Sequence, residues 1–393
     1  MSEAMTVPEV DLSVDGLVQA AIDSCGVSDF GDASYREPFE RLVEALNTEA
    51  KLNAVGRYTW YTRIFNSLRA RLLTEAWIAK HPDILDETIV APAVIVGLPR
   101  TGTTMLHRIM SSDTRFHAPL WYEVRNPAPE LDYRFGDADP RIASAEAEVA
   151  AMLEANPELA AIHPMDPVGA DEEILLLEHS FYSYVPNAFC DVPGYGKWLA
   201  SNDNRPGYEY LKRLLQSLQW QKKQRGESAE RWLLKAPHHL HFMQTLLDVF
   251  PDAQVIQTHR DPLQTVPSIC SFHYNLWIMS SDEADAVRCG EQWADMFARA
   301  MNHTLATRQA QPAAFCDVWY KDTVAKPFDA IAAVYDFLGM PFTDEARAAM
   351  EAWQRENKRE DRPVHEYTLD QFGFTEQGLA EQYRAYRERF IVA

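Results

Sequence analysis

The sequence predicts an α/β protein of three layers, in which a central parallel β-sheet is flanked by helices, with a helical extension at its N-terminal side. A β-branched apolar run at 94–96 ends in a turn rich in Gly and Pro, and helical periodicity resumes up to Met110. Two later apolar runs, at 232–234 and 253–262, are also followed by helical patterns. Residues 1–90 contain helical periodicity and no strand-like run.

The predicted N-terminal extension covers residues 1–90, and the α/β domain covers 91–393. Apolar residues at 39, 42, 43 and 46 have the spacing of one helix face, and 58–80 carries aromatic residues with arginines between them. Two interpretations remain open for this extension. It is either a helical layer packed on the main domain or a cap that helps to wall a ligand pocket.

Composition limits the classes of partner. The formal net charge is −21, which disfavours nucleic acid and anionic membrane surfaces because both require a basic protein surface. No apolar run reaches the roughly 18 residues of a membrane span, and no basic, apolar leader is visible. The five cysteines form no C-x-x-C pair. A cytoplasmic protein is therefore expected.

The turn after the first strand is predicted to bind an anion. The first N–H groups of a helix have no partner within it, and the helix dipole adds positive charge at the same point. Glycines let the backbone bend, threonines offer hydroxyls, and an arginine adds a planar cation. These residues are Gly97, Leu98, Pro99, Arg100, Thr101, Gly102, Thr103 and Thr104.

The spacing of this turn matches a Walker A loop, G-x-x-x-x-G-K-[ST], except at one position. Thr103 stands where the loop of ATP- and GTP-cleaving proteins has a lysine that reaches the terminal phosphates. The sequence therefore disfavours nucleotide cleavage. A glycine-rich turn that binds nothing is the alternative interpretation.

Charged residues follow the second main strand. Lys235 and His238 come directly after the apolar run 232–234, where ligands bind in open α/β sheets. Glu172 and Glu173 stand at a predicted helix start, where carboxylates complement the helix dipole. A carboxylate that faces the ligand could also act as a general base.

A second anion-binding position is predicted at the end of the third strand. Arg260 ends the strand, and Ser268 lies about two turns into the helix that Pro262 opens, so both can converge on one phosphate. The basic cluster at 355–362 is a weaker candidate, since acidic residues are interleaved with it. His238, His239 and His241 lack a Cys or carboxylate at ligand spacing, which disfavours a metal site.

Taken together, L-P-R-T-G-T-T at 98–104, the strand and helix that carry Arg260 and Ser268, and a late W-Y-K-D at 319–322 resemble the P-loop-like superfamily of sulfotransferases. These enzymes use 3'-phosphoadenosine 5'-phosphosulfate (PAPS). The resemblance implies that the loop holds the 5'-phosphosulfate, that Arg260 and Ser268 hold the 3'-phosphate, and that Tyr320 lies near the adenine. It covers roughly residues 91–340.

The sequence departs from the cytosolic branch of this superfamily in the candidate base. That branch has a histidine two residues after a lysine, whereas His238 lies three residues after Lys235. Branches that act on protein tyrosines or glycans use a glutamate, which keeps Glu172 and Glu173 as candidates. The late R-K-G segment of the cytosolic branch is not recognisable.

The resemblance implies in-line transfer of a sulfuryl group to a hydroxyl or amine, with 3'-phosphoadenosine 5'-phosphate (PAP) as product and no metal. Lys235 would stabilise the leaving oxygen, and His238, Glu172 or Glu173 would accept the proton. A P-loop kinase and a non-catalytic PAPS- or PAP-binding protein are the alternatives. Aromatic residues suggest a small apolar or aromatic acceptor; they are Trp121, Tyr122, Phe181, Tyr182, Tyr184 and Trp277. Such residues lie in a core more often than in a pocket, and a glycan or lipid acceptor is the alternative.

Overall fold

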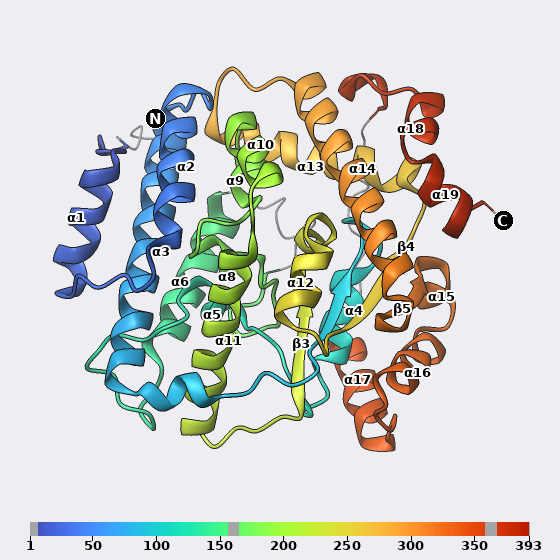
Figure 1. The fold of residues 1–393 in the computed structure, drawn as a ribbon, viewed down its shortest axis with the longest axis horizontal. Coiled ribbons are helices and arrows are strands. Elements are labelled where there is room, and N and C mark those ends of the chain that lie inside the picture. The colour runs from blue at the N-terminus through green and yellow to red at the C-terminus, as the bar shows by residue number, and fades with distance from the viewer. Residues whose placement is uncertain (1–6, 156–164, 358–367, 393) are drawn as a thin grey trace.

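A five-stranded parallel sheet runs through the centre of the computed structural model, which describes residues 7–155, 165–357 and 368–392 (Figure 1). The strand order is β2-β3-β1-β4-β5, and every neighbouring pair is parallel. The strands are β1 (Ala93–Val96), β2 (Phe116–His117), β3 (Arg231–Lys235), β4 (Gln254–His259) and β5 (Phe315–Trp319). This arrangement confirms the predicted α/β class.

Strand residues alternate between two hydrophobic cores, because successive side chains of a strand point to opposite faces. Val94 and Val96 belong to the larger core, which also contains residues of the N-terminal helices. Ala93 and Ile95 belong to a smaller core on the other face. The sheet is therefore covered by helices on both sides, as the apolar runs predict.

The N-terminal part of the chain is helical and shares the larger core. Its helices are α1 (Val14–Cys25), α2 (Arg36–Thr48) and α3 (Ala54–Lys80). Arg71 of α3 is 1% exposed, and its guanidinium donates to the carbonyls of Phe30 and Asp32 at 2.6 and 2.8 Å. The described part of residues 1–90 thus packs into the main body, and the domain boundary at residue 90 stays a prediction.

Helices fill the chain between β1 and β3. They are α4 (Thr103–Met110), α5 (Trp121–Arg125), α6 (Pro140–Ala155), α8 (Ile174–Glu178), α9 (Val185–Phe189), α10 (Pro193–Ser201) and α11 (Arg205–Gln224). Pro, Asp and aromatic residues in 121–140 favour an irregular connection, yet α5 lies within this segment. Glu123 accepts from the backbone N–H of Leu120 at 3.1 Å and so stabilises the first turn of α5.

The chain from β3 onward alternates helices with β4 and β5. The longer helices are α13 (Pro262–Ser280), α14 (Ala286–Ala310), α16 (Pro327–Leu338) and α17 (Asp344–Glu356). Shorter ones are α12 (Met243–Val249), α15 (Tyr320–Ala325), α18 (Glu376–Gln382) and α19 (Arg384–Phe390). β5 ends at Trp319 and Tyr320 begins α15, so the segment W-Y-K-D at 319–322 spans the end of a strand and the start of a helix.

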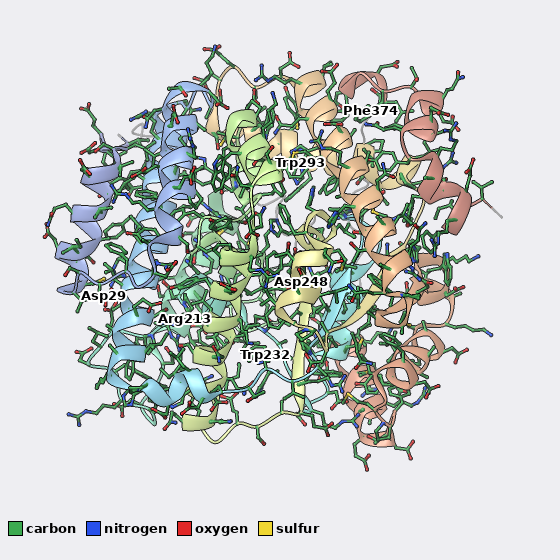
Figure 2. All side chains as sticks on the ribbon, viewed as in Figure 1. Asp29, Arg213, Trp232, Asp248, Trp293 and Phe374 are labelled. Carbon is green, nitrogen blue, oxygen red and sulfur yellow. The ribbon has the colours of Figure 1, made fainter. Side chains whose placement is uncertain are left out.

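Side chains fill the space between these ribbons (Figure 2). Arg213 of α11 faces α3, where its guanidinium donates to Glu75 at 3.0 and 2.6 Å (Figure 2). Contacts of this kind fix α3 and α11 beside each other and position the segments that follow α11. Among the described helices, none has the length and hydropathy needed to cross a membrane.

Candidate active site

The loop at 97–102 connects the buried strand β1 to α4 at the carboxyl edge of the sheet. Gly102 is the N-terminal cap of α4 and has φ 90°, a conformation that favours glycine, and no side chain caps this helix. The first N–H groups of α4 therefore remain available to a ligand. Arg100, an exposed residue of the loop, also has a positive φ of 72°. Such backbone strain in a non-glycine residue is concentrated at functional sites.

Two threonines support the loop from inside. The Thr101 hydroxyl donates to the carbonyl of Leu98 at 2.6 Å and lies 2.6 Å from the hydroxyl of Thr258 on β4. A Cβ on Gly97 would lie 2.1 Å from that Thr258 oxygen, so only glycine fits there. Thr101 is 1% exposed, and any contribution it makes to an anion site would come from its backbone.

Lys235 reaches the loop from the neighbouring strand. Its ammonium donates to the Thr104 hydroxyl at 3.3 Å and pairs with a carboxylate oxygen of Glu172. The Lys235 side chain is 2% exposed and that of Glu172 is 21% exposed. An ammonium group thus lies against the first turn of α4, although Thr103 replaces the lysine of the Walker A loop.

Glu173 belongs to a different, fully buried network. One carboxylate oxygen accepts from the backbone N–H of Lys235 at 2.7 Å, and the other pairs with Nε2 of His239 at 2.6 Å. The Nδ1 atom of His239 lies 2.8 Å from the Tyr208 hydroxyl. Burial raises the pKa of Glu173, but His239 and the Lys235 amide outweigh it and hold that pKa below its usual range.

His238 lies among aromatic rings, and it makes no hydrogen bond to this network. Its ring centroid lies 5.1 Å from that of Phe242 and 5.4 Å from that of Tyr184. Neither ring nitrogen has a hydrogen-bond partner among the described residues. Burial, assisted by His239 and His241, lowers the pKa of His238 well below its ordinary value, which keeps the ring neutral.

Arg260 reaches the loop from the end of β4. Its guanidinium donates to the carbonyl of Arg100 at 3.0 Å and lies 4.3 Å from the ring centroid of Tyr320. The Tyr320 ring in turn covers Gly102, where an added Cβ would lie 3.1 Å from a ring carbon. The structure therefore brings Arg260, Tyr320 and the loop together. Ser268 is half-buried on α13.

Several contact residues of this region were missed by the sequence analysis. His239 pairs with Glu173 and is itself bound by Tyr208. On α19, Tyr386 contacts His259 at the end of β4, and Arg387 contacts Asp261 at the start of α13. These pairs lie far apart along the chain, so no local motif indicates them.

The basic cluster at 355–362 and the six aromatic residues were two further candidates for contact with a ligand. The basic cluster falls largely outside the described residues, since Lys358, Arg359 and Arg362 lie within 358–367. The six aromatic residues considered for an acceptor pocket are at most 7% exposed and pack in the core. Within the described ranges, no group of three or more His, Cys, Asp or Glu residues could hold a metal ion.

An uncapped helix after a buried strand, joined by a lysine and an arginine from the adjacent strand ends, is typical of α/β proteins that bind phosphorylated nucleotides. Comparison with known proteins identifies a family within this class. The model of the sulfotransferase family matches residues 92–344, and the chain belongs to this family.

Solved structures and curated relatives agree with this assignment. Sulfotransferase STF9 from Mycobacterium avium has 26% sequence identity and a TM-score of 0.87, over 99% of each chain. STF1 from Mycobacterium tuberculosis H37Rv has 29% identity and a TM-score of 0.81, over 95% of this chain and 98% of its own.

A curated relative from Mycobacterium tuberculosis, omega-hydroxy-beta-dihydromenaquinone-9 sulfotransferase Stf3, is 27% identical over 263 residues. That match covers 65% of this chain and 64% of the relative. The chain therefore spans slightly less than two thirds of the length of this curated relative.

Proposed function

We propose that the protein transfers a sulfuryl group from PAPS to a hydroxyl or amine of a small-molecule acceptor and releases PAP. The observation that carries this proposal is the position of the Lys235 ammonium between the Thr104 hydroxyl and the Glu172 carboxylate. A cation and an accessible carboxylate thus lie together at the anion-binding loop. Sulfuryl transfer would use the cation to stabilise the leaving oxygen and the carboxylate to accept the proton of the acceptor.

The residues of the loop fit a phosphosulfate group. The α4 N-terminus lacks a side-chain cap, so its first N–H groups can donate to an anion. Arg100 is exposed at the loop, and Arg260 adds a second guanidinium beside it. Two guanidinium groups and a helix N-terminus thus lie in one place and favour binding of an anion. They form a local positive site in a protein whose net charge is −21.

Each residue receives a role from its position. The backbone of 98–104, with Arg100, Thr103 and Thr104, would hold the 5'-phosphate, and Arg260 and Ser268 would hold the 3'-phosphate beside Tyr320. PAPS supplies the sulfuryl group. As the acceptor oxygen bonds to sulfur, the bond from sulfur to the phosphate oxygen breaks, and Lys235 would stabilise the charge on that oxygen.

Glu172 is the candidate base that the geometry supports best. Its side chain is 21% exposed beside Lys235, whereas Glu173 is fully buried and occupied by His239 and a backbone amide. His238 is 2% exposed, and its lowered pKa makes it a weak base. We propose that a carboxylate oxygen of Glu172 takes the proton from the hydroxyl or amine of the acceptor.

The acceptor class is proposed from the curated relative. That protein is named for an omega-hydroxylated menaquinone, and we propose an apolar small molecule with a hydroxyl group for this chain. All five cysteines are free thiols. This favours a reducing compartment, and we propose the cytoplasm.

The donor assignment is tested by calorimetric titration with PAP and with ATP and Mg²⁺. We expect micromolar binding of PAP, weak binding of ATP, and a loss of at least tenfold in PAP affinity in Arg260→Ala, because a charge-assisted contact to phosphate is removed. Tighter binding of ATP would favour the kinase alternative. Failure of both ligands to bind would refute the nucleotide site.

The base assignment is tested with labelled PAPS and a panel of apolar alcohols and phenols. We expect Glu172→Gln to lower kcat by about 10²- to 10⁴-fold, as for loss of a general base, with little change in PAP affinity. Glu146→Gln, at an exposed position of α6, is the matched control. An unchanged kcat in Glu172→Gln would exclude this residue as the base, and binding of PAP without turnover of any acceptor would favour a binding protein.

A further inference from the structure

The C-terminal helix α19 holds both chain neighbours of Arg260. Residue 259 ends β4, and residue 261 is the N-terminal cap of α13. Figure 1 shows α19 at the edge of the molecule, beyond β4 and β5. The family model ends at residue 344, so α19 lies outside the matched region.

Arg387 of α19 binds the carboxylate of Asp261 with two hydrogen bonds. Its Nε and a terminal nitrogen donate to the two carboxylate oxygens at 3.0 and 3.1 Å. Asp261 also accepts from the backbone N–H of Leu263 at 3.1 Å, which caps α13. The planar fork of arginine therefore fixes the carboxylate that begins α13.

Tyr386 and Phe390 hold His259 on the other side. The Tyr386 hydroxyl lies 3.0 Å from Nδ1 of His259, and the Phe390 ring stacks on the imidazole with centroids 4.2 Å apart. Nε2 of His259 lies 2.7 Å from a carboxylate oxygen of Asp317 on β5. With Nε2–H donating to Asp317, Nδ1 accepts from the Tyr386 hydroxyl.

Arg260, between these two anchored residues, reaches toward the loop. Its guanidinium donates to the Arg100 carbonyl and lies over the Tyr320 ring. Because the side chains of both chain neighbours, His259 and Asp261, are held by α19, the direction of the Arg260 side chain depends on that helix. Positioning errors of about 1 Å are enough to weaken a charged site strongly.

We infer that α19 is a clamp that presents Arg260 to the ligand, with Tyr386 and Arg387 as positioning residues. This inference rests on the proposed function, in which Arg260 contacts a phosphate of the nucleotide. Loss of the clamp should weaken nucleotide binding and leave the rate at saturating PAPS nearly unchanged, because Lys235 and Glu172 lie on other elements.

A purely structural role for the same residues predicts a different result. The side chains of Arg387 and Asp261 are 19% and 21% exposed, and partly exposed ion pairs contribute little to global stability. A structural role would thus leave ligand affinity unchanged. The clamp predicts a local effect at 259–265 together with a loss of affinity.

The test compares Arg387→Ala, Arg387→Lys and Tyr386→Phe with the control Arg384→Ala. Arg384 is the first residue of the same helix and pairs with Glu381 at 2.9 Å, with both side chains mostly exposed. Amide hydrogen exchange of the ligand-free proteins reports the order of 259–265, and titration with PAP reports affinity. The KM for PAPS and kcat are measured separately.

We expect Arg387→Ala to speed exchange at 259–265 and to weaken PAP binding at least fivefold, with KM raised and kcat within about twofold. Arg387→Lys should recover part of the affinity, and Arg384→Ala should match the wild type. Unchanged exchange or unchanged PAP affinity in Arg387→Ala would overturn the clamp. If wild-type protein does not bind PAP, the proposed function fails, and the exchange rates alone then decide whether α19 orders this turn.

Discussion

Glu172 and Glu173 are adjacent carboxylates with opposite surroundings. Glu172 pairs with the Lys235 side chain at the loop, while Glu173 binds the Lys235 backbone and the buried His239. Both therefore act on the same lysine, one on its charge and the other on its position. A buried carboxylate that accepts from several donors is costly to replace, because each donor loses its partner.

This contrast gives a prediction for Glu173→Gln. A glutamine amide can accept with only one of its two polar atoms, so the Lys235 N–H or His239 loses its acceptor. We expect the free energy of unfolding to fall by about 1–3 kcal/mol and kcat to fall at least tenfold through displacement of Lys235. Denaturant titration and the labelled-PAPS assay measure the two effects.

Glu123→Gln is the matched control for general destabilisation. Glu123 is also fully buried, and it pairs with Lys222 at 2.7 Å, away from Lys235. We expect a similar loss of stability and a kcat within about threefold of wild type. An equal fall in kcat in both variants would contradict a positioning role for Glu173.

At the scale of elements, the ends of helices and strands that depend on neighbouring residues can be predicted from local sequence patterns. Gly339 adopts φ 68° directly after Leu338 and ends α16, which is the usual role of a glycine after an apolar helical pattern. Lys235 and Arg260 were predicted at strand ends from apolar runs alone. Lys235 does end β3, whereas β4 ends at His259 and Arg260 is the first residue after it. Parallel strands then bring these residues to one edge of the sheet.

Elements fixed by distant contacts were predicted less well. The aromatic run at the end of β5 favours a strand, yet the strand stops at Trp319, whose indole donates to the Phe390 carbonyl at 2.9 Å. That partner lies 71 residues further along the chain. The contacts of α19 with His259 and Asp261 span 127 and 126 residues and leave no periodic pattern either. Residue types thus indicated the loop and its cations, but not the groups that hold them in place.

At the scale of the whole molecule, net charge and buried histidines oppose each other as pH falls. The net charge is −21 at pH 7 and the isoelectric point is near 5.0, so acidification reduces self-repulsion and favours the compact state. Several histidines are buried in the neutral form. Burial lowers the pKa of His107 and His179 to about 4 and that of His273 to about 3.

Because these histidines are buried in the neutral form, we expect acid to destabilise the fold. The unfolded chain binds protons at these rings below pH 6.5, whereas the folded chain does not until about pH 4 or lower, so stability is present above pH 6.5 and is lost as pH falls. The linkage amounts to about 2 kcal/mol for each histidine between pH 7 and 5.

Denaturant midpoints measured from pH 7.5 to 5 distinguish the two effects, because self-repulsion alone predicts a midpoint that rises toward the isoelectric point. We expect the midpoint to fall instead. His273→Phe, at a ring that packs 3.9 Å from the Trp293 ring centroid, should reduce the dependence on pH, since phenylalanine keeps the packing and cannot bind a proton. A midpoint that rises on acidification, or an identical slope in this variant, would show that the buried histidines do not control the acid stability of the fold.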